Sequence, residues 1–397
     1  MQTELTERQE KLRERLMRRL DTEGFLSDAQ ILDLIDELIL EEGRTSLLRL
    51  REKEELRKGL FYSVRRLDII QELLEDPEVT EIMVNGYEQI FVERKGRITL
   101  WDKCFSSEER LKDVIQQIAG FCNRVANEQR PIMDARLPGG ERVNVVLPPV
   151  ALNGPVMTIR RFPEKPITME QMVQWGTLTE EAADYLKHLV RAGYSILVGG
   201  GTSTGKTTFL NALSSFIPEE ERIVTIEDNA ELQIQGIGNL VRLEARSANL
   251  EETKEISIRD LIRTALRMRP SRIIVGEVRS GEAADFLSSL NTGHSGSLGS
   301  AHANSVRDMI ARLEMMVLMS SMQLPIPAIR RQIASGVEIL VHLGRTVSGQ
   351  RQLCEIAEIV GMEGDEILIS TIFQRDADGI LQKTGELVSR EKWEKLI

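Results

Sequence analysis

Aromatic residues make up only 4% of the 397 positions in this sequence. So few rings provide no extended platform on which nucleic-acid bases would stack. Basic residues are also in the minority: 51 lysines and arginines face 62 aspartates and glutamates, for a formal net charge of −11. Because binding to a phosphate backbone needs clustered cations, this balance argues against nucleic-acid binding over the whole surface, although it leaves room for a local basic channel.

Cysteine is scarcer still, and Cys104, Cys122 and Cys354 lie far apart in the chain. That spacing forms neither a disulfide framework nor a C-x-x-C metal site. No apolar run approaches the roughly 18 residues that span a bilayer, and the first residues lack the basic and then apolar layout of a signal peptide. We therefore expect a protein of the reducing cytoplasm, with roughly two or three domains for this length.

Hydrophobic periodicity divides the first part of the chain into two predicted regions. Residues 1–60 carry leucine and isoleucine at helical spacing, which predicts a small helical bundle; a docking module for a partner is the alternative. Residues 61–162 predict an α+β domain with a small, mostly antiparallel sheet. Its strands are expected near 80–84, 89–92, 97–101, 142–146 and 157–160, and its helices near 65–74 and 107–125.

A predicted linker at 163–170, marked by prolines, introduces the rest of the chain, 171–397. Here strands expected near 194–198, 222–226, 272–276 and 297–301 alternate with helices. That alternation predicts an α/β fold with a doubly wound, mostly parallel sheet. Strands expected near 337–343, 352–360 and 366–373 extend or cap this sheet.

The segment 199–208 has the phosphate-loop pattern G-x-x-x-x-G-K-T between an expected strand and an expected helix. Its glycines let backbone N–H groups face a phosphate chain, Lys206 adds a positive charge for binding and catalysis, and the Thr207 hydroxyl is placed to bind Mg²⁺. A glycine-rich connector is the disfavoured alternative. The residues predicted to bind nucleotide here are Gly200, Gly201, Thr202, Ser203, Thr204, Gly205, Lys206, Thr207 and Thr208.

Carboxylates follow two of the expected strands. Glu277 comes directly after the strand near 272–276, and a parallel neighbour of the loop strand would deliver it beside a γ-phosphate, where it would organise or deprotonate the attacking water. Gly276 occupies the position where many phosphate-loop enzymes have an aspartate. Glu227 and Asp228 follow the strand near 222–226 and are expected to hold Mg²⁺ through waters or to orient the water. The alternatives are a solvated strand-end glutamate and loop carboxylates with no such role.

Two of the four histidines, His294 and His302, lie in one Gly/Ser-rich segment. A zinc site would need further soft ligands, and none are near. We expect one or both histidines to sense the γ-phosphate or the adjoining subunit. A hydrogen-bonded structural role is the alternative for each.

One group of arginines recurs at helical spacing, at Arg259, Arg263 and Arg267. Like charges at that spacing repel one another on an isolated helix. They are expected either to be screened by solvent or to face anions, such as a neighbour's carboxylates or a nucleotide at a subunit boundary. Arg263 is the residue predicted to bind nucleotide.

A second group lies in the α+β region, at Arg136, Arg142, Arg160 and Arg161. The first two flank a turn that fixes their separation. If this domain closes over the phosphate loop, the four arginines are expected to grip the γ-phosphate, with Arg142 and Arg160 acting in catalysis. The alternative is an exposed basic patch.

Together these motifs resemble the secretion-ATPase superfamily of pilus and secretion motors, over about residues 61–360. Segments 134–138, 142–144, 243–246 and 267–270 are most similar to the CpaF/TadA branch, which serves tight-adherence pili. The segments that carry the wider resemblance are 199–208, 225–228, 273–279, 291–297 and 302–305.

The resemblance implies a RecA-like phosphate-loop domain preceded by a small α+β, PAS-like domain and an N-terminal helical region. It implies ATP and Mg²⁺ as cofactors and a homohexamer with nucleotide between the two domains. It also implies docking on an inner-membrane platform protein, at the cytoplasmic face, to assemble or retract a type IV pilus without direct nucleic-acid binding. The four-cysteine metal module of some pilus-extension relatives is absent from this sequence.

Other functions remain as alternatives. A conjugation-type traffic ATPase shares the same motifs. A phosphate-loop kinase or GTPase is disfavoured, because no Asn-Lys-x-Asp guanine signature is present. A scaffold that binds ATP with negligible hydrolysis is disfavoured by Glu277 and Glu227.

Overall fold

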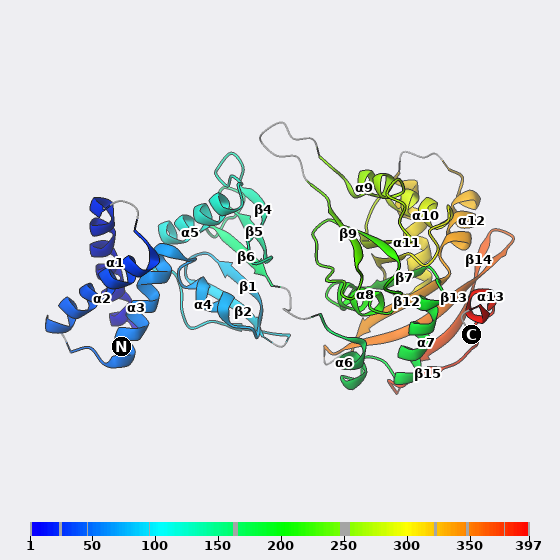
Figure 1. The fold of residues 1–397 in the computed structure, drawn as a ribbon, viewed down its shortest axis with the longest axis horizontal. Coiled ribbons are helices and arrows are strands. Elements are labelled where there is room, and N and C mark those ends of the chain that lie inside the picture. The colour runs from blue at the N-terminus through cyan, green and yellow to red at the C-terminus, as the bar shows by residue number, and fades with distance from the viewer. Residues whose placement is uncertain are drawn as a thin grey trace. The chain divides into compact units, whose positions relative to one another are not determined.

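The computed structural model describes residues 2–23, 26–45, 47–94, 96–161, 166–246, 255–320, 324–346, 349–376 and 378–395. The chain divides into two compact units, Met1–Glu164 and Lys165–Ile397 (Figure 1). The predicted linker at 163–170 lies partly outside the described residues, and the first helix of the second unit begins within it. None of the helices in the described ranges is long and apolar enough to cross a membrane.

The first unit begins with helices α1 (Gln2–Glu23), α2 (Asp28–Thr45) and α3 (Leu50–Arg65). The leucine and isoleucine stripes pack against one another in a small core of their own, as the helical spacing predicts. The predicted start of the helix expected near 65–74 is wrong. α3 continues to Arg65, and α4 (Ile70–Glu75) begins only after Asp68, whose positive φ of 52° interrupts the helix.

A sheet with strand order β3-β2-β1-β6-β5-β4 completes the first unit, and neighbouring strands in this order pair antiparallel, as expected. Helix α5 (Glu108–Phe121) packs its apolar face into the core on one side of this sheet. β4 was not expected, because only Met133 among its residues is fully buried and its sequence lacks a β-branched run. The strands are β1 (Val79–Asn85), β2 (Gln89–Arg94), β3 (Arg97–Leu100), β4 (Ile132–Arg136), β5 (Arg142–Val146) and β6 (Val156–Arg160).

The second unit is built on a larger sheet. Its strands are β7 (Ile196–Gly200), β8 (Arg222–Glu227), β9 (Asn239–Glu244), β10 (Arg272–Val278), β11 (Leu298–His302), β12 (Ile339–Arg345), β13 (Arg351–Glu363), β14 (Glu366–Arg375) and β15 (Leu381–Lys383). Their order is β15-β14-β13-β12-β7-β11-β10-β8-β9, parallel from β12 to β9 and antiparallel from β12 to β15. This confirms the α/β fold with a mostly parallel sheet, extended by the C-terminal strands.

Helices cover both faces of this sheet and bury a separate core on each (Figure 1). On one face lie α6 (Met169–Gln174), α7 (Glu180–Arg191), α8 (Lys206–Ser214) and α13 (Glu391–Glu394). On the other lie α9 (Ile258–Ala265), α10 (Ala283–Leu290), α11 (Val306–Leu318) and α12 (Ile326–Gly336). The carboxyl ends of β7, β11, β10 and β8 meet at one edge, which is where open α/β sheets bind ligands.

Candidate functional site

The phosphate loop connects the fully buried strand β7 to α8. Gly205, at the helix N-cap, has a φ of 94°, and Ser203 is also left-handed, with a φ of 58°. Gly200 has no room for a side chain: a Cβ there would lie 2.5 Å from Thr204 Oγ1 and 2.7 Å from the carbonyl oxygen of Leu343. Glycine is therefore required where the backbone turns back on itself at the end of β7.

Lys206 is held inside this loop and is only 8% exposed. Its Nζ donates to the carbonyl oxygens of Gly200 and Gly201, at 3.1 and 2.9 Å, and lies 3.4 Å from His302 Nδ1. Burial lowers the pKa of Lys206, while the nearby Glu277 carboxylate opposes that shift. A phosphate oxygen would offer this ammonium a charged acceptor in place of two neutral ones.

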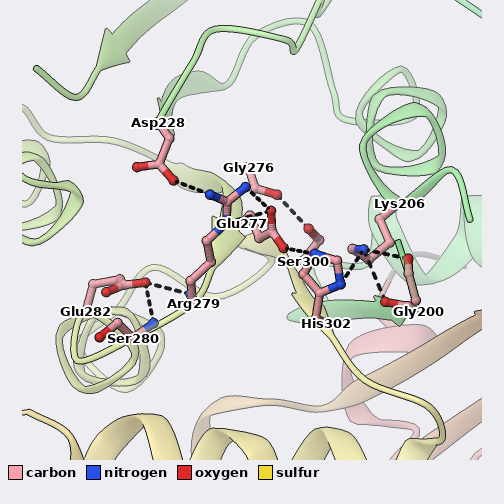
Figure 2. Close-up of polar contacts among 11 residues, drawn as sticks. Gly200, Lys206, Asp228, Gly276, Glu277, Arg279, Ser280, Glu282, Ser300 and His302 are labelled. Carbon is pink, nitrogen blue, oxygen red and sulfur yellow. Dashed lines mark hydrogen bonds and ion pairs between the residues drawn. The ribbon is translucent and has the colours of Figure 1, made fainter. Parts of the chain in front are cut away.

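A continuous row of ionisable side chains extends from Lys206 to Asp228 (Figure 2). His302 Nε2 lies 2.7 Å from Glu277 Oε1, and Glu277 Oε2 accepts hydrogen bonds from Arg279 Nε and Nη2 at 2.8 and 2.6 Å. Arg279 Nη1 then lies 3.2 Å from Asp228 Oδ2. The structure thus brings together the predicted lysine, histidine and carboxylates, with Arg279 as a link to which the sequence analysis assigned no role.

Strand pairing explains why His302 reaches the loop. β11 runs parallel to β7 and pairs His302 with Gly200. Burial lowers the pKa of His302, although Glu277 acts in the opposite direction. His294, by contrast, precedes the amino end of β11, so a strand length of about 16 Å separates it from the loop edge. The structure therefore does not bring His294, one of the two histidines expected to sense the γ-phosphate or the adjoining subunit, into this row.

A bulge in β10 positions Glu277. The register of β10 against β11 shifts between Val275 and Val278, and the Ser300 hydroxyl donates to the Gly276 carbonyl oxygen at 2.6 Å (Figure 2). Bulges re-aim side chains beside active sites. A Cβ at Gly276 would lie 2.9 Å from Glu227 Cγ, which gives a steric reason for glycine where many phosphate-loop enzymes have aspartate.

Glu227 is the most deeply buried carboxylate of the site, at 3% exposure. Its Oε1 accepts backbone N–H groups of Glu231 and Leu232, both at 2.8 Å. Its Oε2 is buried without a hydrogen-bond partner among the residues that the structure describes. Burial raises the pKa of Glu227 to about 7, although these two N–H groups act in the opposite direction.

This raised pKa predicts that the stability of the second unit depends on pH. The folded state binds the Glu227 proton more tightly than the unfolded state, so the stabilisation is complete below the ordinary pKa of 4.5 and is lost as pH rises through about 7. We expect the free energy of unfolding to fall by on the order of 3 kcal/mol over that interval, relative to Glu227→Gln. Denaturant titrations of the wild type and of Glu227→Gln at several pH values measure the free energy of unfolding. If the difference in this free energy between the two proteins does not vary with pH, the prediction is contradicted.

Two of the three arginines at helical spacing form ion pairs with the neighbouring helix. Arg259 Nε and Arg263 Nε donate to the two oxygens of Asp285, at 2.7 and 2.8 Å. Asp285 lies on α10 and is 7% exposed. Within this chain the ion pairs with Asp285 join α9 to α10. The partner of Arg263 is therefore Asp285 and not a nucleotide.

The arginines of the first unit form an ordered row. Strand register places Arg136 opposite Arg142, and Arg142 opposite Arg160, so their side chains share one face of the sheet. Glu81 is the next residue of this row, opposite Arg160. Arg161 points elsewhere and donates to backbone carbonyls between α4 and β1, among them that of Val79 at 3.0 Å. The structure thus separates Arg161 from the other three.

Beside the phosphate loop lies a pocket of about 380 Å³ that sequence reasoning missed. Its lining combines loop residues with an apolar wall, a composition suited to a flat apolar ligand. No local motif marks the wall, because its residues come from separate parts of the second unit. The lining residues are Ile167, Met172, Trp175, Thr177, Thr204, Gly205, Thr208, Phe209, Leu343, Gln350 and Arg351.

Similarity to known proteins agrees with this arrangement. The chain is 35% identical over 302 residues to a putative conjugal transfer protein of Mycobacterium tuberculosis, covering 75% of this chain and 85% of that protein. It is 35% identical over 303 residues to the type IV secretion system protein VirB11 of Brucella suis, covering 70% and 84%. The crystal structure of the pilus retraction motor PilT with bound ADP has a similar fold, with a TM-score of 0.52 and 20% identity over 83% of this chain and 86% of PilT. Residues 64–377 match the family described as Type II/IV secretion system protein, and the chain belongs to that family.

Proposed function

We propose that this protein is a Mg²⁺-dependent ATPase that powers a type IV pilus, of the tight-adherence kind, or a related secretion apparatus. The observation that carries the proposal is the row from the phosphate-loop lysine through His302 to Glu277, held at the carboxyl edge of a parallel sheet. Family membership supports the connection to secretion. A scaffold that only binds nucleotide has no need of a carboxylate aimed at the loop.

The residues of the site have different roles in the proposed reaction. Backbone N–H groups of the loop and Lys206 bind the phosphate chain. Glu277, kept in place by Arg279 and His302, accepts the proton of the attacking water. Glu227, at the end of the neighbouring strand β8, and Asp228, directly after it, support this carboxylate. His302 senses whether the γ-phosphate is present.

The donors present suit a magnesium ion. No cluster of three or more histidine, cysteine or acidic side chains placed to hold a metal occurs within the described ranges. Mg²⁺ normally keeps several waters and is shared between a few protein oxygens and the substrate phosphates. The Thr207 hydroxyl would bind it directly, and Glu277 or Glu227 through waters. Bound Mg²⁺ supplies charge neutralisation for the phosphates.

The apolar pocket is suited to the adenine base. Trp175, Met172 and Phe209 offer it a hydrophobic surface next to Thr208, at the start of α8. Arg136, Arg142 and Arg160 complete the site from the first unit when it closes. Arg263 and His294 act at the boundary between subunits of a homohexamer. Docking on a membrane platform protein at the cytoplasmic face then transmits the movement.

A conjugation-type secretion ATPase is the second candidate. It is favoured by the relatives named for conjugal transfer and for type IV secretion, each at 35% identity. Identification of the membrane protein that co-purifies with the chain separates the two: a pilus platform supports the first candidate, and a secretion-channel subunit supports the second.

Phosphate release by the purified full chain tests the enzymatic proposal. We expect release from ATP that requires Mg²⁺ and exceeds release from GTP, because the pocket offers the base mainly apolar contacts. Lys206→Ala is the control for contaminating activity and is expected to release none. Activity equal in both proteins would refute the assignment. Light scattering with ADP should report six copies of the 44.9 kDa chain.

A further inference from the structure

Two arginines of the hairpin formed by β12 and β13 contact the phosphate loop from outside. Arg345, the last residue of β12, donates from Nη2 and Nε to the carbonyl oxygen of Ser203 at 2.5 and 3.0 Å. Arg351, the first residue of β13, donates from Nε to the same oxygen at 3.3 Å. Two guanidinium groups thus converge on one backbone carbonyl of the loop.

This convergence is unusual in its electrostatics. Arg345 and Arg351 are direct partners in the antiparallel pairing, where like charges oppose each other unfavourably. Their common acceptor belongs to Ser203, a residue with a side chain in the left-handed region, which is uncommon outside glycine and needs support from its surroundings. The hydrogen bonds to the Ser203 carbonyl therefore have two effects. They compensate for the repulsion between the two arginines, and they stabilise the strained conformation of Ser203.

The geometry of the peptide bond connects this contact to the phosphate side of the loop. A trans peptide is planar, and its C=O and N–H point in opposite directions. When the arginines hold the Ser203 carbonyl toward the hairpin, the N–H of Thr204 must point away from the hairpin. N–H groups of the loop are the ones that bind phosphate oxygens.

The same hairpin also contacts the neighbouring pocket. Arg351 lines that pocket, and its Cδ would lie 3.2 Å from a Cβ at Gly205. Gln350, which precedes it, donates from Nε2 to the carbonyl oxygen of Trp175 at 2.7 Å. The hairpin therefore supports both the loop and the wall of the pocket.

We propose that Arg345 and Arg351 are positioning residues for nucleotide binding. They hold Ser203 in its left-handed conformation and keep the loop shaped for a phosphate chain before the nucleotide arrives. This inference rests on the proposed nucleotide-binding function and adds a dependence of that site on the C-terminal strands. Because the arginines act on the shape of the loop and not on the attacking water, their loss weakens binding and leaves the chemical step largely unchanged.

Calorimetric titration with MgADP and steady-state ATP hydrolysis test the proposal on the full chain. In Arg345→Gln we expect the Kd for ADP and the KM for ATP to rise about tenfold, the effect of losing a charged hydrogen-bond donor. The kcat should change by less than about threefold. Arg345→Lys should recover part of the affinity, because an ammonium can still donate to the Ser203 carbonyl. Arg351→Gln should have a smaller effect of the same kind, since its contact is longer.

Arg330→Gln provides the matched control, because Arg330 pairs with Glu314 and joins α12 to α11, on the face of the sheet opposite α8. Unchanged Kd and KM in the double variant Arg345→Gln/Arg351→Gln would overturn the inference, as would a fall in kcat at constant KM. If the double variant instead has a lowered unfolding temperature and an unchanged KM, the arginines serve only the stability of the fold, and the inference is likewise overturned. If the wild-type chain itself fails to bind MgADP, it is the proposed function that is refuted.

Discussion

In the Glu277→Gln variant we expect ATP to bind with wild-type affinity and to be hydrolysed about 10²–10⁴-fold more slowly, the usual contribution of a positioned general base. The amide keeps the size of the carboxylate and can still accept a hydrogen bond from Arg279, so the bulge in β10 and the loop should keep their shape. It cannot take a proton from water. The loss should therefore appear in kcat and leave the Kd for MgATP unchanged.

Single-turnover phosphate release and a binding titration measure the two quantities separately. Glu363→Gln, an exposed carboxylate of β13 in the same unit, serves as the matched control and should behave as the wild type. Unaltered turnover in Glu277→Gln would remove Glu277 from the mechanism. Weakened binding together with lost turnover would instead point to damage of the loop.

The second large effect is expected from the arginine row of the first unit. Arg142→Ala and Arg160→Ala should each lower kcat by about 10²-fold or more, as is typical of arginines that stabilise the charge of a transferred phosphoryl group. Stability should change little, by under about 1 kcal/mol, because both side chains lie on the face of the sheet opposite the core and Arg160 is exposed. The disparity between activity and stability is the signature of a side chain that acts on a ligand outside its own unit.

Arg97→Ala, on β3 at the opposite edge of the same sheet, is the control for a general loss of positive charge. It should retain full activity. If Arg142→Ala and Arg160→Ala also retain full activity, the first unit does not close on the nucleotide. A loss confined to Arg160→Ala would assign the function to one residue of the row instead of three.

Much of the fold follows from local patterns. The strands near 222–226 and 272–276 were predicted because fully buried strands of a parallel sheet read as continuous apolar runs. β9, by contrast, was missed: it lies at the edge of the sheet, has only half-buried and exposed positions and carries Arg242 and Glu244. Its pairing with β8, and not its composition, makes it a strand.

The residues of the candidate site could also be predicted only in part from the sequence. Glu277 and Glu227 could be singled out because each lies at the carboxyl end of a buried strand, and parallel strands deliver these ends to one edge. Arg279 could not, since its role depends on contacts with Glu277 and with Asp228, which follows another strand. His294 and His302 looked equivalent in the sequence, but the direction of β11 puts only His302 beside the loop.

By itself, the sequence determined the phosphate loop, the strand-end carboxylates and most of the helices and strands, because each depends on neighbours within a few residues. Only the tertiary structure decided which distant groups meet. Arg345 is 142 residues from Ser203, yet the pairing of β12 with β7 brings its guanidinium to that carbonyl. Likewise, strand register alone aligned Arg136, Arg142 and Arg160 on one face and turned Arg161 away. Strand order is a property of the whole sheet, so no local pattern encodes which strands become neighbours.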